Sequence, residues 1–187
     1  MGHVGNDGRP FTAAEQERFE WALLLAYERS VQQPPPLTLP TLLDWHAALS
    51  AHHPRMHPGA FREGEITFGS FLGTLAPDVP LEIGAALNVH QEAVMLWTAC
   101  LEVGMPPDAD DVLTHATWLH AELLRIHPMH DGNGRLARLV QYWLMHAYGL
   151  RAPDYSRDRA AYYQALAAYF LHRDLHPLLT LSRTHLI

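Results

Sequence analysis

Apolar residues return at helical spacing along most of the chain, which predicts a fold built from α-helices. The clearest case lies between residues 108 and 126, where one stripe is formed by Val112, Ala116, Leu119 and Leu123. The first helix also has a start signal, because Thr12 is followed three residues later by Glu15, the spacing of a capping box. The predicted helices cover approximately residues 12–32, 39–51, 87–103, 108–126, 135–148 and 156–172.

One segment departs from the helical pattern and predicts a small β-hairpin between residues 57 and 69. It opens with the turn His57-Pro58-Gly59, and a weaker turn at Glu63-Gly64 separates Phe61-Arg62 from Ile66-Thr67-Phe68. Residues 70–84 contain Gly and Pro and are expected to form a loop. We therefore predict an all-α fold, a single helical domain over residues 11–187 with a small β-hairpin, preceded by a flexible tail at residues 1–10.

Composition and charge exclude several classes of function. The 187 residues carry a net charge of −7, so non-specific binding to a nucleic-acid backbone is not expected. All 13 basic residues are arginines, which rules out lysine chemistry such as Schiff bases or a P-loop lysine. No apolar run reaches the ~18 residues of a membrane helix, and the N-terminus lacks the signal-peptide pattern. With Cys100 as the single cysteine, we expect a reducing, bacterial cytoplasmic setting, and export as an effector stays open.

Candidate chemistry gathers between two strongly periodic helices, in the segment His127-Pro-Met-His-Asp-Gly-Asn-Gly-Arg-Leu-Ala-Arg138. Gly132 and Gly134 allow backbone conformations that aim several N–H groups into one concavity, which with the next helix N-terminus suits a di- or triphosphate. The polar side chains beside it suit the same ligand. Arginine makes bidentate phosphate contacts, a carboxylate is the ligand type that Mg²⁺ prefers, and histidine is a base near neutral pH. They are Arg135, Arg138, Asp131 and His127.

This segment resembles the signature of the Fic family: His-Pro-Phe, a variable residue, Asp or Glu, then Gly-Asn-Gly-Arg, two residues and Arg. The match is complete except that Met129 stands where the family has Phe. The resemblance extends to His120, to Pro58–Arg62 leading into a flap hairpin, and to residues 158–166, so it covers about residues 39–175.

The resemblance implies a protein adenylyltransferase of Fic type, which uses ATP and Mg²⁺ to transfer AMP to a Ser, Thr or Tyr hydroxyl of a target protein. His127 would take the hydroxyl proton and Asp131 would hold Mg²⁺. The phosphates would be bound by Gly132, Asn133 and Gly134, whose backbone forms the anion hole with help from the Asn133 side chain, and by Arg135 and Arg138. The hairpin around Ile66, Thr67 and Phe68 would hold the target segment by main-chain pairing.

Two alternatives stay open. A relative on the same fold, Doc, phosphorylates its target, but its motif replaces Gly-Asn-Gly with Ala-Asn-Lys, whereas Gly134 here keeps the nest open. A different class would be a metal-dependent hydrolase that uses His127, His130 and Asp131 with His115 or His120.

Many Fic proteins carry an inhibitory helix whose pattern is Ser or Thr, three residues, Glu, then Gly or Asn. Thr98 and Glu102 have the spacing, but Val103 follows and the segment lies mid-chain. We therefore expect either a separate, antitoxin-like inhibitor of a toxin-like enzyme or none. A glutamate ion-paired with Arg138 would contradict this prediction.

Overall fold

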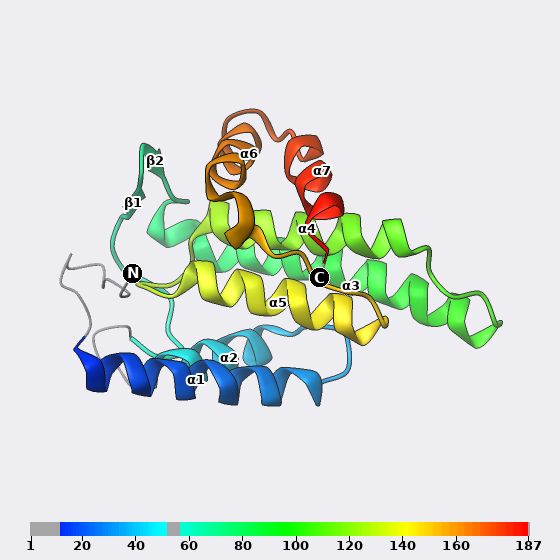
Figure 1. Ribbon diagram of the computed structural model, residues 1–187, viewed down its shortest axis with the longest axis horizontal. Helices are drawn as coiled ribbons and strands as arrows, with labels where there is room; N and C mark the ends of the chain where they lie inside the picture. The colour runs from blue at the N-terminus through cyan, green and yellow to red at the C-terminus, as the bar shows by residue number, and fades with distance from the viewer. Residues whose placement is uncertain (1–11, 52–56, 187) are drawn as a thin grey trace.

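The computed structural model describes residues 12–51 and 57–186. The predicted tail, residues 1–10, lies outside the described part of the chain. Within it, the fold consists of seven α-helices, two short 3₁₀-helices and one antiparallel two-stranded hairpin at one end of the molecule (Figure 1). The elements are α1 (Ala13–Val31), α2 (Leu39–Ser50), β1 (Thr67–Phe68), β2 (Phe71–Leu72), η2 (Ala76–Asp78), α3 (Val79–Glu102), α4 (Ala109–Ile126), α5 (Asn133–Ala147), η3 (Tyr155–Asp158), α6 (Arg159–His172) and α7 (His176–Thr184).

The core is built around α4 and α5, which pack against each other and are joined by the loop that carries the candidate motif. All four residues of the predicted α4 stripe are buried. Figure 1 shows α1 and α2 on one side of α5, and α6 and α7 on the other. On the first of these sides, the rings of Trp45 and Trp143 meet edge to face with centroids 5.2 Å apart, which fixes α2 against α5.

Helix starts follow the side-chain signals closely. Thr12 and Glu15 form the predicted capping box at α1. Thr38 caps α2, Asp108 caps α4 and Asp158 caps α6, each through a side-chain oxygen that accepts a first-turn N–H. Across the described residues, no helix is both long and apolar enough to cross a membrane.

Two predicted elements were wrong in their bounds, and one helix was missed. Helix α3 begins at Val79 rather than near residue 87, because Pro80 occupies its first turn, where proline needs no N–H partner. The hairpin turns at Gly69-Ser70 instead of Glu63-Gly64, with Thr67 opposite Leu72 and Phe68 opposite Phe71. Helix α7 was not predicted at all. The hairpin nevertheless projects beside the start of α5, at the end of the molecule that carries the motif (Figure 1).

Candidate functional site

His127 ends α4 in a left-handed backbone conformation, with φ 53° and ψ 59°. This region costs a non-glycine residue energy and persists only where the surroundings enforce it. The His127 N–H donates to the carbonyl of Leu123 at 3.0 Å, and its own carbonyl accepts from Arg62 Nε at 2.7 Å. The chain is thus turned sharply out of the helix, and the imidazole is directed toward the hairpin.

The hydrogen bonds of the imidazole define its chemistry. Nδ1 lies 3.2 Å from the carbonyl oxygen of Leu124. Because a carbonyl can only accept, Nδ1 carries the proton and Nε2 is left as the basic atom. Burial lowers the pKa of His127 to about 4, so the ring is neutral at pH 7. His127 is therefore in the state that a general base requires.

Within the loop after His127, an amide side chain binds both main-chain groups of one residue. Asn133 Oδ1 accepts from the N–H of Met129, and Asn133 Nδ2 donates to the carbonyl of Met129, both at 2.9 Å. Met129 is fully buried in the core, as expected for the position where the resembling family has Phe. The Asn133 side chain thus fixes the conformation of the loop. Its predicted contribution to an anion hole stays a prediction.

Gly132 is the N-cap residue of α5 and shapes the expected phosphate site. Its φ of 80° lies in the left-handed region, which glycine adopts without strain. The next N–H groups, of Asn133 and Gly134, are in the first turn, where a helix offers donors without intrahelical acceptors. A Cβ added to Gly134 would lie 3.6 Å from Arg138 Nη1, so the exposed Arg138 guanidinium sits directly beside this helix start. The arrangement suits an anion.

Asp131 faces the same helix start. Its Oδ1 accepts from the Gly132 N–H at 2.5 Å and lies 3.4 Å from Arg135 Nη2. These contacts leave Oδ2 as a hard oxygen ligand, which fits Mg²⁺ because that ion takes one or two carboxylates together with substrate phosphates. Among the described residues, no three His, Cys, Asp or Glu side chains gather as a metal site. The hydrolase alternative gains no support, since His115 contacts His90 and His120 contacts Tyr162 instead.

The hairpin, which we term the flap (residues 60–74), closes one side of the site. Phe68 stacks on the His127 ring, with centroids 4.1 Å apart and planes 12° apart. A groove of about 720 Å³ runs between the flap and the loop of residues 127–134, which we term the catalytic loop for the role that the sequence predicts. The groove is lined by all three predicted flap residues, Ile66, Thr67 and Phe68, together with His127 and His130. The structure thus brings the predicted flap residues to the predicted base.

Two residues at this junction were missed by sequence reasoning. Arg62 is 5% exposed and His46 is fully buried, and both bind backbone groups of the catalytic loop. Arg62 belonged to a segment that resembled the family's flap, without a role. His46 stood on an otherwise apolar helix face, and a polar residue in such a place is a signal that it has a buried partner.

The helix pattern considered for intramolecular inhibition is not placed on the site. Thr98 and Glu102 are exposed on α3. In the described residues, no carboxylate lies within ion-pair distance of Arg138. The observation that would have contradicted the inhibitor prediction is therefore not found in this part of the chain, and a separate inhibitor stays a prediction.

Comparison with known proteins identifies the family of the chain. The Fic/DOC family profile matches residues 36–145. The chain is 27% identical over 154 residues to Protein adenylyltransferase Fic from Nematostella vectensis. That match covers 80% of this chain and 32% of the relative, so the chain spans about a third of the relative's length.

Solved structures share the fold. Fic-1 of C. elegans (residues 134–508) superposes with a TM-score of 0.73 at 19% identity, covering 94% of this chain and 50% of that one. BepC of Bartonella tribocorum, solved with bound AMPPNP, superposes with a TM-score of 0.69 at 16% identity, covering 99% and 92%. At such identities the likeness concerns the fold.

Proposed function

Because the chain belongs to the Fic/DOC family and has its helical fold with a small hairpin, we propose that it is a protein adenylyltransferase. It transfers AMP from ATP to a Ser, Thr or Tyr hydroxyl of a target protein. The observation that carries this proposal is the neutral His127, whose Nε2 is free of the Leu124 contact and whose ring stacks on Phe68 and lines the groove beside the flap. A relative named as an adenylyltransferase and a similar structure that binds an ATP analogue support the same reading.

In the proposed reaction, the target segment lies along the flap and presents its hydroxyl to His127 Nε2. His127 takes the proton as the hydroxyl oxygen attacks the α-phosphorus of ATP. A bond forms between that oxygen and the α-phosphorus, the bond from the α-phosphorus to the bridging oxygen breaks, and pyrophosphate leaves. Positioning and charge neutralisation dominate such chemistry, and the N–H groups at the start of α5 with Arg135 and Arg138 provide both.

Asp131 is the residue that would hold Mg²⁺. The ion, when bound, neutralises phosphate charge. Arg135, which already lies 3.4 Å from Asp131, would keep this carboxylate aimed at the phosphates.

Phosphotransfer of the Doc type is the second candidate on the same fold. It is disfavoured by Gly134, because a longer side chain here would occupy the space beside the Arg138 guanidinium that we assign to the distal phosphates. We further propose that any inhibitor is a separate protein that supplies a carboxylate to Arg138.

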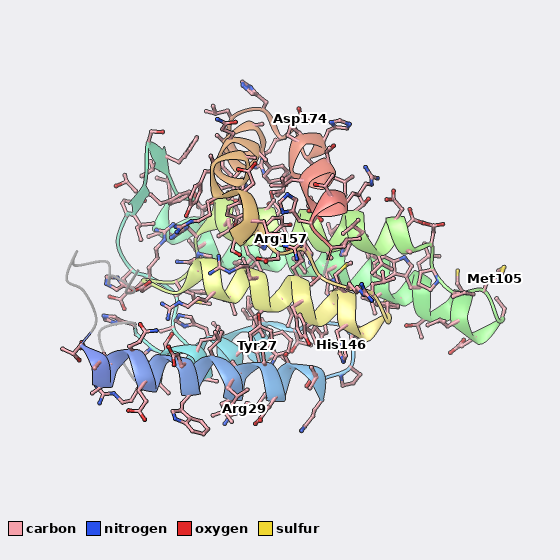
Figure 2. The ribbon with its side chains drawn as sticks, in the orientation of Figure 1. Tyr27, Arg29, Met105, His146, Arg157 and Asp174 are labelled. Atoms are coloured by element: carbon pink, nitrogen blue, oxygen red, sulfur yellow. The ribbon has the colours of Figure 1, made fainter. Side chains whose placement is uncertain are left out.

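The test is incubation with Mg²⁺, cell lysate and either α-³²P-ATP or γ-³²P-ATP. Wild type, His127→Ala and His146→Ala are compared. His146 is a suitable control because it is exposed near the far end of α5 from the motif (Figure 2). We expect label from the α-position alone, lost in His127→Ala and kept in His146→Ala. Label from the γ-position alone, or α-label that survives in His127→Ala, would overturn the proposal.

A further inference from the structure

The guanidinium of Arg62 is buried between the flap and the catalytic loop, and its hydrogen-bond partners are main-chain carbonyls. Nε donates to His127 at 2.7 Å and Nη1 donates to Gly64 at 2.8 Å. Nη2 donates to Ile126 at 3.3 Å and to Thr74. One side chain therefore binds both ends of the flap and the last turn of α4 at once. The carbonyls at that turn are the negative end of the helix dipole, which favours a cation there.

The backbone around Arg62 repeats the connection. The Arg62 N–H donates to the carbonyl of Pro128 at 2.9 Å, and Phe61 forms a β-bridge with Met129. Gly73, which follows β2 near the other end of the flap, also lies close to Arg62 and His127. A Cβ there would lie 3.0 Å from Arg62 Nη2 and 3.4 Å from the Cβ of His127, so only glycine lets the two segments meet without displacing Arg62.

His46, on α2, makes a second connection between the segment that leads into the flap and the catalytic loop. Its Nδ1 accepts from the N–H of Gly59, just before the flap, at 3.1 Å. Its Nε2 lies 3.0 Å from the carbonyl oxygen of Asp131 and therefore carries the proton that bonds to it. The ring is fully buried, on the inner face of α2. A single imidazole thus joins the flap entrance to the backbone of the expected Mg²⁺ ligand.

We propose that Arg62 and His46 are positioning residues that hold the flap in register with the catalytic loop, so that a target hydroxyl laid on the flap meets His127 Nε2. This inference rests on the proposed function for its catalytic consequence. Arg62 bonds to carbonyls outside the expected phosphate site, and His46 reaches that site only at the main-chain carbonyl of Asp131, which is not a group assigned to Mg²⁺ or phosphate. We therefore expect the larger effect on the target rather than on the nucleotide. A misplacement of about 1 Å costs an enzyme up to about 100-fold in rate.

The experiment uses the two halves of the His46 contact. In His46→Asn, the amide oxygen can still accept from the N–H of Gly59, but the side chain is too short to reach the carbonyl of Asp131. In His46→Gln, the amide nitrogen can still donate to the carbonyl of Asp131, but the acceptor for Gly59 is lost. Arg62→Gln removes most of the carbonyl contacts. Thr117→Val is the matched control, because Thr117 is buried and hydrogen-bonded to Gln141 and Ser182 away from the site.

Two readouts are measured, and only one depends on the proposed activity. Hydrogen exchange follows the N–H of Gly73 in the flap and of Met129 in the loop. We expect exchange at both sites to rise about fivefold or more in each site variant, in line with the loss of one hydrogen bond. With the labelled target, we expect KM for the target to rise about tenfold and kcat to fall, with AMPPNP affinity within about twofold of wild type.

The outcomes separate the two proposals. Exchange that rises in one segment but not in the other, or equally in Thr117→Val, shows that the residues are merely structural and overturns the inference. Loss of AMPPNP affinity equal to the loss in kcat/KM also overturns it. If the wild type fails to modify any target but both segments still loosen together, the coupling stands and the adenylyl-transfer proposal alone fails.

Discussion

At the scale of single residues, Asn133 shows how a motif side chain can serve the loop rather than the ligand. It satisfies both main-chain groups of the buried Met129. In Asn133→Ala these groups lose their partners, so we expect the free energy of unfolding to fall by about 3 kcal/mol. Urea unfolding measures this, and Asn88→Ala, at an exposed asparagine in α3, should change it by no more than about 0.5 kcal/mol.

The same variant discriminates between two roles for Asn133. A fully stable Asn133→Ala protein that has lost AMPPNP binding would show a direct contact with the nucleotide. A destabilised protein whose nucleotide affinity recovers when the folded fraction is restored at low temperature would show that Asn133 shapes the site by holding the loop.

At the scale of elements, α3 has two apolar faces but only one of them contributes to the core. Leu87 is 4% exposed and Leu96 is 64% exposed on the same helix. Leu87→Ala should therefore lower the free energy of unfolding by about 2–5 kcal/mol, and Leu96→Ala by less than about 0.5 kcal/mol. Equal losses measured by urea unfolding would contradict the orientation of α3 described above.

The two faces of α3 also explain which helices could be predicted from the sequence. In α4 and α5 the apolar stripe coincides with the buried face, so their positions were predicted to within a few residues. The same periodicity assigns Trp21 of α1 to a buried face, yet Trp21 is 67% exposed. Periodicity reports that a face is apolar, and only tertiary packing decides whether another element covers it.

The site was predictable where its contacts are local in sequence. His127, Asp131, Gly132 and Arg138 fall within twelve residues, and the α4–α5 junction brings them together. Arg62 and His46 contact the same loop from 65 and 85 residues away. No spacing rule connects residues so far apart, because their meeting depends on how α2 and the flap dock onto the finished core.

At the scale of the whole molecule, buried neutral histidines couple folding to pH. Burial lowers the pKa to about 3 for His90 and His120, and to about 4 for His115 and His127. His90 Nδ1 and His115 Nε2 lie 3.1 Å apart, so only one of these two nitrogens carries a proton. In the unfolded chain each of these histidines titrates near pH 6.5.

The sign of the effect follows from proton uptake. Between about pH 4 and 6.5 these histidines bind protons in the unfolded chain but not in the folded protein. The free energy of unfolding therefore rises with pH in this range and is lost as the pH falls. Each histidine contributes up to about 1.4 kcal/mol per pH unit, and four together are enough to unfold a domain of ordinary stability near pH 5.

We therefore expect the melting temperature, followed by circular dichroism, to be nearly constant from pH 7 to 8 and to fall steeply below pH 6.5. His115→Gln should reduce the slope of the melting temperature against pH by about one proton's share, whereas Asn88→Ala, which removes no titrating group, should leave it unchanged. Because His127 stays neutral throughout this range, activity should show no separate titration near pH 6.5 and should disappear only as the protein unfolds. An activity loss centred at pH 6.5 in a protein that is still folded would contradict the buried, neutral base on which the proposed reaction depends.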